Sequence, residues 1–155
     1  MKPCFSDLDK QYMMLAIKEA EQAAAIGEVP VGAVIVSSDG AVLAQGHNLR
    51  EIQKNALHHA EILVIDAACQ SKKSWRLSGC TLYVTLEPCL MCSGAIVNAR
   101  IDRVVYGAKD ARAGAMGSLF HVNSYPLNHK PIIESGLCEE TCCQLLTDFF
   151  KKKRK

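Results

Sequence analysis

The segment CTLYVTLEPCLMCSGAIVNARIDRVVYG, residues 80–107, decides the fold class. Residues 80–87 read as a buried strand, residues 88–100 return to helical spacing, and residues 103–107 form another short apolar, β-branched run. Pro88 stands in the first turn of the expected helix, where proline is tolerated best. A strand, a helix and a second strand in this order predict a helical crossover between parallel strands.

Upstream of this unit, the sequence predicts a helix and a hairpin. Residues 7–27 have acids at their start, strong helix formers throughout and Gly27 at the end. Residues 29–48 contain two apolar, β-branched runs around Ser38-Asp39-Gly40, which is the chemistry of a tight hairpin turn. Because a hairpin is antiparallel and a crossover is parallel, we expect a mixed sheet.

The remaining segments complete a layered α/β domain. HHAEILVIDAACQ, residues 58–70, predicts a buried helix, and CEETCCQLLTDFF, residues 138–150, predicts an amphipathic one. Residues 108–131 lack clear periodicity and are long for a plain connection, which makes them a candidate functional loop. No internal repeat or low-complexity linker divides the chain, so we expect a single domain over residues 1–155.

Composition places the chain among ordinary globular proteins. It has 155 residues, of which 49% are hydrophobic and 22% charged, and a net charge of +2. The one concentration of charge is FFKKKRK at residues 149–155, whose basic tail at 150–155 is either a solvated, frayed end or a contact for nucleic acid. Charge alone does not separate these two interpretations.

The termini and the cysteines indicate a cytoplasmic protein. The first fifteen residues contain no continuous apolar segment of a secretory leader, and no later run is long enough to span a bilayer. We therefore expect a protein of the cytoplasm with no membrane partner. In that compartment the eight cysteines are better assigned to metal binding, catalysis or reduced core thiols than to disulfides.

The candidate chemistry lies at the starts of two helices. Cys89 and Cys92 are three residues apart, so their sulfurs share a helix face at the end where the helix dipole favours a thiolate. A redox pair would need a thioredoxin-like context, whereas His59 offers a third donor one helix upstream. One histidine and two cysteines leave a fourth position open on a tetrahedral zinc, as in catalytic sites.

A carboxylate completes the constellation. Glu61 is two residues beyond His59, and we expect both at the mouth of the helix, since two such positions inside a helix diverge by about 200°. A carboxylate near the metal but not bound to it is suited to proton transfer with an activated water. H-x-E followed by P-C-x-x-C is typical of zinc deaminases acting on nucleobases, here HAE at 59–61 and PCLMC at 88–92. The alternative is a structural zinc.

The spacing also separates the two adjacent histidines. Only His59 stands in the H-x-E spacing with Glu61, so His58 is interpreted as a neighbour of the site or a surface residue. Cys138, Cys142 and Cys143, with His121 and His129 upstream, offer a possible second metal site. Because Cys138 and Cys142 share one helix face, as core residues do, the core interpretation is favoured.

With these motifs in view, the sequence resembles the bacterial tRNA-specific adenosine deaminases. The similar segments cover most of the chain in the same order. They are GEVPVGAVIV (27–36), GHN (46–48), LYVTLEPCLMCSGAI (82–96), RIDRVVYGAKDARAGAMGSL (100–119) and LLTDFF (145–150). The resemblance implies a cytidine deaminase-like fold, three layers α/β/α around a mixed sheet of about five strands. It also implies hydrolytic conversion of adenosine to inosine at the wobble position of a tRNA anticodon, in a homodimer.

The resemblance implies roles for individual residues. His59, Cys89 and Cys92 would bind one Zn²⁺ per subunit, and Glu61 would carry a proton from the activated water to the purine ring. Asn48 would hydrogen-bond the flipped base, in a pocket shaped by Glu28, Val29 and Leu86. The anticodon backbone would contact Lys109, Asp110 and Arg112, and Phe149 with the basic tail would also contact RNA. From composition alone, plain surface charge is the favoured interpretation of Lys109 and Arg112.

One segment departs from the family pattern. Before its H-A-E the family commonly has Asp-Pro-Thr-Ala, whereas this chain has Asn55, Ala56, Leu57 and His58. Loss of the proline is expected to free the loop and alter the pocket. Two alternatives therefore stay open: a free-base or nucleoside deaminase of the guanine or cytosine type, and a non-catalytic nucleic-acid-binding module with structural zinc. The basic tail and the 107–119 loop argue against the first.

Overall fold

The computed structural model describes residues 4–154. In chain order its elements are α1 (Asp7–Ala25), β1 (Gly32–Val36), β2 (Val42–His47), α2 (Ala60–Lys72), β3 (Thr81–Leu86), α3 (Leu90–Asn98), β4 (Arg103–Ala108), the 3-10 turn η1 (Val122–Ser124), β5 (Ile132–Ser135) and α4 (Glu139–Lys153).

The sheet is mixed, as the sequence predicted. Its strand order is β2-β1-β3-β4-β5. β1 pairs antiparallel with both β2 and β3, whereas β4 pairs parallel with β3 and with β5. The β3–α3–β4 unit is the expected crossover. At the hairpin between β1 and β2, Gly40 has φ 88°, a left-handed conformation that glycine adopts without steric cost.

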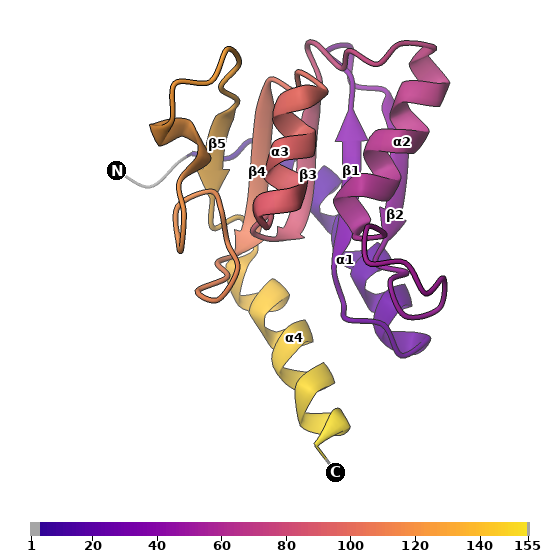
Figure 1. Ribbon diagram of the computed structural model, residues 1–155. Coiled ribbons are helices and arrows are strands. Elements are labelled where there is room, and N and C mark those ends of the chain that lie inside the picture. Colours follow the sequence, from indigo (N-terminus) through magenta and orange to yellow (C-terminus); the bar gives the residue numbers. More distant parts are fainter. Residues whose placement is uncertain (1–3, 155) are drawn as a thin grey trace.

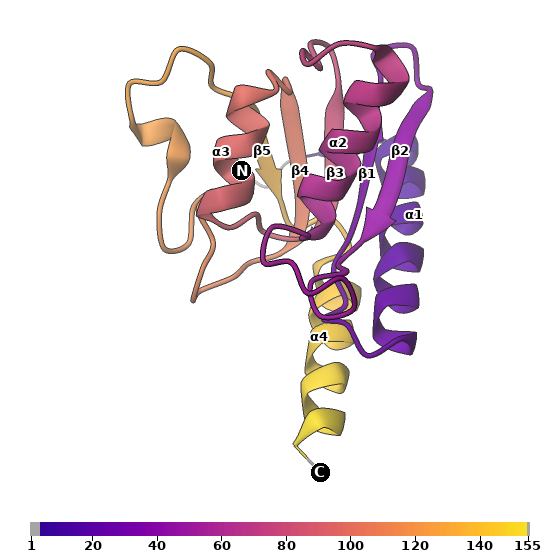
Figure 2. The ribbon, with the colours of Figure 1, turned by 45° about the vertical axis from the view of Figure 1, so that its right-hand side comes forward.

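Helices cover both faces of the sheet, which confirms the three-layer α/β/α architecture. α2 and α3 lie side by side on one face, and α1 and α4 lie on the other (Figures 1 and 2). Along β1, Ala33 and Ile35 enter the core under α2 and α3, while Val34 and Val36 enter the core under α1 and α4. This alternation follows from the period of two in a strand buried on both sides.

The first helix begins and ends as its sequence predicts. Ser6 and Asp9 form a capping box, in which the Asp9 N–H donates to the Ser6 hydroxyl at 3.0 Å and the Ser6 N–H donates to the Asp9 carboxylate at 3.1 Å. At the other end the helix stops at Ala25, and Gly27 takes a φ of 83°.

Three boundaries differ from the prediction. α3 begins at Leu90, with Cys89 as its N-cap, so Pro88 precedes the helix and is not in its first turn. The fifth strand, β5, was given no position by the sequence, because its four residues offer too short a pattern. α4 continues through Lys153, so most of the basic tail is helical, while Lys155 lies outside the described residues.

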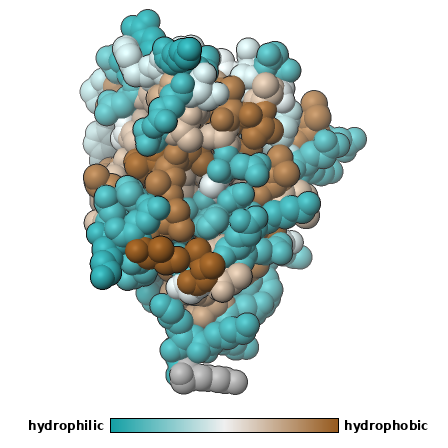
Figure 3. All heavy atoms as spheres, turned by 90° about the vertical axis from the view of Figure 1, so that its right-hand side faces the viewer, coloured by the Kyte–Doolittle hydropathy of each residue, from teal (hydrophilic) through white to brown (hydrophobic). Residues whose placement is uncertain are grey.

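α4 extends beyond the rest of the molecule, with the carboxyl terminus at its far end (Figures 1 and 2). On the face that bears α2 and β2, apolar side chains gather in patches separated by polar ones (Figure 3). Over residues 4–154, none of the helices combines the length and the apolar character needed to cross a bilayer.

Candidate active site

The site lies at one edge of the sheet, where four chain segments meet. β2, β3 and β4 end at this edge, and β1 begins there because it runs antiparallel to β3. α2 and α3 begin at the same edge, so the positive ends of both helices point toward it. Ligands of open α/β sheets commonly bind outside the carboxyl ends of strands.

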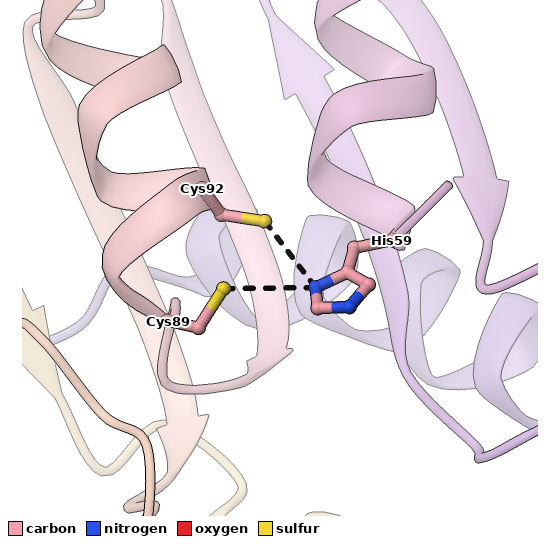
Figure 4. A group of neighbouring side chains, drawn as sticks. All are labelled: His59, Cys89 and Cys92. Carbon is pink, nitrogen blue, oxygen red and sulfur yellow. Dashed lines mark hydrogen bonds between the residues drawn. The ribbon is translucent and has the colours of Figure 1, made fainter. Parts of the chain in front are cut away.

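His59, Cys89 and Cys92 converge between the two helix starts (Figure 4). His59 is the N-cap of α2, Cys89 is the N-cap of α3, and Cys92 lies in the first turn of α3. His59 Nδ1 is 3.6 Å from each of the two sulfurs. A tetrahedral zinc with bonds of about 2.3 Å to sulfur and about 2.0–2.1 Å to nitrogen separates these atoms by about 3.6 Å. The donor set therefore fits a zinc ion.

Cys89 and Cys92 differ in pKa, and the lowered pKa of Cys89 favours the binding of a cation. Hydrogen bonding from Cys92 and from His59 lowers the pKa of Cys89 to about 4, whereas the same contact with Cys89, together with burial, raises the pKa of Cys92. The hydrogen bond with Cys89 also raises the pKa of His59. In the protein without metal, the pair thus holds one thiolate and one thiol, and a bound cation would favour the second thiolate.

Glu61 is the carboxylate of the site. It is 4% exposed, lies in the first turn of α2 and lines the same cavity as His59 and Cys89. Burial raises its pKa to about 7. A carboxyl group with such a pKa, beside a site for an activated water, is suited to exchange protons near neutral pH.

The cavity in front of these groups has a volume of about 150 Å³. Of the residues expected to bind the base, Val29, Asn48 and Leu86 line it. Asn48 is 5% exposed, and its Oδ1 accepts the Arg50 N–H at 3.3 Å. This contact orients the side-chain amide and leaves its NH₂ group as the donor available to a base.

A wider groove of about 700 Å³ adjoins the cavity. Val29, Leu86, Asp110 and Ala113 line both, so the groove leads directly into the cavity. Its remaining lining includes the predicted Lys109 and Arg112 and, from α4, Leu146, Phe150 and Arg154. The groove therefore has three cationic side chains and an aromatic ring beside the entrance to the cavity.

Three predicted residues have surroundings that the sequence did not reveal. Glu28 is fully buried and holds a neighbouring loop, since its carboxylate accepts the N–H groups of Glu51 at 3.1 Å and Ile52 at 2.8 Å. Phe149 is 7% exposed, whereas the adjacent Phe150 is 42% exposed and lines the groove. The Asp110 carboxylate accepts the N–H groups of Arg112 and Ala113 at 3.0 and 3.1 Å, so it shapes its own turn.

Sequence reasoning missed two charged residues that line the cavity, Arg50 and Glu87. Glu87 is 2% exposed and directly precedes Pro88 and Cys89. Burial opposes ionisation of its carboxyl, but hydrogen bonds from Ser118, Asp110 and Met116 outweigh that effect and lower its pKa. Its place beside the P-C-x-x-C motif was the available signal; its partners, more than twenty residues away, were not visible in the sequence.

The segment that departs from the family pattern is held by its own hydrogen bonds. The Asn55 side chain accepts the Leu57 N–H at 2.9 Å, and the Asn55 carbonyl accepts the His58 N–H at 3.1 Å. His58 lies outside the group of three donors, and its buried Nδ1 has no hydrogen-bond partner in the described part of the chain. Asn55 thus closes a turn over residues 55–58, in which Ala56 stands at the position of the family's proline.

Comparison with known proteins agrees with this geometry. The family model of the MafB19-like deaminases matches residues 8–154. A tRNA-specific adenosine deaminase of Bacillus subtilis is 49% identical over 95% of this chain and 91% of its own length. One from Haemophilus influenzae is 43% identical over 96% of this chain and 87% of its own length.

Solved structures show the same fold. One from work on A-to-I editing by tRNA:A34 deaminases at the wobble position has a TM-score of 0.85 and 44% identity, over 88% of this chain and 99% of the other. A guanine deaminase from Bacillus subtilis has a TM-score of 0.64 and 30% identity, over 94% of both chains.

Proposed function

This chain belongs to the MafB19-like deaminases and, within them, to the tRNA-specific adenosine deaminases, and on that premise we propose that it converts adenosine to inosine at the wobble position of a tRNA anticodon. The observation that carries the proposal is the convergence of His59, Cys89 and Cys92 beside the buried Glu61 in one cavity. The reaction is hydrolytic: water adds at C6 of the purine and the amino group leaves as ammonia.

Different residues of the site have different roles in this reaction. His59, Cys89 and Cys92 would hold one Zn²⁺ per subunit, and the bound ion would supply the Lewis acidity that lowers the pKa of a water toward neutrality. Glu61 accepts a proton from the attacking water and delivers it to the purine ring. Asn48 donates to the base, while Val29 and Leu86 contact its faces.

The groove supports RNA as the substrate in preference to a free base. A base must leave its stack to enter a closed cavity, which costs least in a single-stranded loop. Lys109, Arg112 and Arg154 line the approach and are placed for phosphates, and Phe150 offers a ring for stacking. Because a tRNA is the substrate, we expect the protein to act in the cytoplasm.

A homodimer is part of the same proposal. On α3, Leu90 is 60% exposed and Gly94 is also exposed, and in the loop that follows Gly117, Leu119 and Phe120 are 52% and 43% exposed. Burial of such apolar surface is the main favourable term in protein association. Light scattering on the purified protein is expected to give twice the chain mass, and a monomer at micromolar concentration would contradict the dimer.

The test of the function is a deamination assay. Zinc-loaded protein is incubated with an arginine-type anticodon stem-loop carrying adenosine at the wobble position, and in parallel with adenosine, cytidine and guanine. We expect inosine from the stem-loop alone. Turnover of guanine or of a free nucleoside instead would assign the protein to salvage of small molecules. The altered 55–58 segment would then be the first region to test as the cause of the changed substrate.

A further inference from the structure

Glu87 receives four hydrogen bonds from a single loop, the 109–118 loop. Its Oε1 accepts the N–H of Asp110 at 3.1 Å and the hydroxyl of Ser118, and its Oε2 accepts the N–H groups of Met116 and Ser118, each at 3.0 Å. The carboxylate thus joins both ends of the loop to the segment that carries Cys89.

A buried carboxylate requires compensation, because an unpaired charge out of water is costly. Here the hydrogen-bond donors are backbone N–H groups and one hydroxyl of the loop. Hydrogen bonds to an ionised acceptor are stronger than neutral ones. The side chain is therefore satisfied only while the 109–118 loop keeps this conformation.

A second observation shows that the loop and Glu87 fit closely. A Cβ at Gly114 would lie closer than van der Waals contact to Cδ and Oε2 of Glu87 and to the Asp110 carbonyl. The Ala115 N–H donates to the Pro88 carbonyl at 2.9 Å, and Cys89 and Gly114 form an isolated β-bridge. The backbone of the loop thus lies directly against the start of the P-C-x-x-C segment.

The loop held in this way carries part of the binding surface. Asp110 and Ala113 line the catalytic cavity, and Lys109 and Arg112 line the groove beside it. We propose that Glu87 is a positioning residue, which fixes the 109–118 loop against the metal-binding segment and so determines how tightly the anticodon loop is bound. This inference rests on the proposed function for its substrate and deepens it.

The test compares three variants of the zinc-loaded protein. Glu87→Gln removes the charge and one acceptor with little change of shape, and Gly114→Ala keeps Glu87 but places a Cβ against its carboxylate, which displaces the loop. Asp102→Asn is the matched control: Asp102 accepts the Gly79 N–H at 2.6 Å at the opposite edge of the sheet, where β4 begins. It loses the same charge and a similar loop contact away from the site.

Two measurements distinguish an effect on the conformation of the loop from an effect on binding of the substrate. Hydrogen exchange of residues 110–118 in the absence of RNA tests whether Glu87 holds the loop in place. Fluorescence anisotropy with a wobble-adenosine stem-loop gives Kd independently of turnover. We expect faster exchange and a Kd raised about ten-fold or more in Glu87→Gln and Gly114→Ala, the loss of a charge-assisted hydrogen bond being of that order. Zinc content should change by less than about three-fold, since the ligands are untouched, and Kd should rise by a larger factor than kcat at saturating stem-loop falls.

The possible outcomes distinguish failure of the role proposed for Glu87 from failure of the proposed deaminase function. Unchanged exchange, or faster exchange with an unchanged Kd, would overturn the role of Glu87 even in a fully active enzyme. A fall in melting temperature, zinc content and kcat with Kd unaltered would indicate a merely structural role and overturn it as well. A wild-type protein that binds the stem-loop without deaminating it would refute the proposed function alone, and one that does not bind it would refute both.

Discussion

Glu61 and His59 face the same cavity although they are only two residues apart. His59 is the N-cap of α2 with extended backbone, φ −71° and ψ 156°, whereas Glu61 is already helical. Inside a helix their side chains would diverge by about 200°, so the change of backbone conformation at the N-cap is what brings them together. This is the helix-mouth arrangement that the H-x-E spacing predicted.

Replacing Glu61 with glutamine isolates proton transfer. The Glu61→Gln side chain keeps its size but cannot accept a proton, so we expect deamination of the stem-loop to fall by about 10²–10⁴-fold. Zinc content, measured by atomic absorption, should stay at one ion per chain because the three donors are unchanged. Retained turnover in this variant would refute the role of Glu61 and favour a binding module with structural zinc.

Two adjacent phenylalanines on α4 provide a second residue-scale prediction. Phe150 is 42% exposed in the groove, whereas Phe149 is 7% exposed. Phe150→Ala should weaken stem-loop binding by about 1–3 kcal/mol, the usual contribution of base stacking on an aromatic ring, and leave stability nearly unchanged. Phe149→Ala should instead lower the free energy of unfolding in urea by about 2–3 kcal/mol, toward the low end for a buried ring. The reverse pattern would place the RNA contact on Phe149.

At the scale of elements, the candidate metal site joins two helices at their starts. His59 stands at the start of α2, and Cys89 and Cys92 at the start of α3. The ion would thus be a cross-link between α2 and α3 in addition to its catalytic role. The strands that precede these ligands end at the same edge of the sheet: Cys89 follows β3 after residues 87–88, and His59 follows β2 after the longer segment 48–58.

Removal of zinc is expected to destabilise the protein. A ligand that binds only the folded state stabilises it by about 4 kcal/mol when present at a thousand times its Kd. Treatment with a chelator should therefore lower the melting temperature measured by calorimetry, and added Zn²⁺ should restore it. Cys92→Ala serves as the control, since it lacks a ligand and should melt at the same temperature with or without chelator. Identical melting curves of the wild-type protein with and without chelator would contradict stabilisation of the fold by a bound ion.

At the scale of the whole molecule, one ionic network joins the first helix to three strands of the sheet. Arg103 at the start of β4 donates to Asp9 of α1 at 2.8 and 3.0 Å and to Glu134 of β5. The Tyr83 hydroxyl of β3 donates to Asp9 at 2.6 Å. Four elements far apart in the sequence therefore share a cluster that is largely buried, with Asp9 at 6% exposure.

This network predicts a loss of stability in acid. The Arg103 guanidinium, against the effect of burial, holds the pKa of Asp9 well below its ordinary value of about 3.9. The stabilisation is complete above the unfolded pKa, near pH 4, and is lost as the pH falls toward the lower folded pKa. Urea unfolding at pH 6 and pH 3 should show this loss, and Arg103→Met, which removes the cationic partner of Asp9 and leaves its hydrogen bonds from Tyr83 and Ser6, should cost about 3 kcal/mol at pH 6. Equal stability of Arg103→Met and wild type at pH 6 would contradict it.

The sequence by itself determined the mixed sheet, the order of helices and strands, and the donors His59, Cys89 and Cys92 with Glu61 beside them. These follow from local rules, because periodicity, turn residues and the spacing of ligands all lie within a few residues of one another. The same locality explains the exact agreement at Gly27 and the hairpin turn, and the shift of two residues at α3.

Only the tertiary structure decided which residues surround the site. Glu87 contacts residues 23–31 positions away, Glu28 holds a loop 23–24 positions away, and the difference in exposure between Phe149 and Phe150 depends on how α4 packs. Such contacts leave no periodic trace in the sequence, since they are set by chain closure and by where helices lie on the sheet. The reacting groups of the site could therefore be predicted from short sequence motifs, whereas the shape that selects its substrate arises from packing between distant segments.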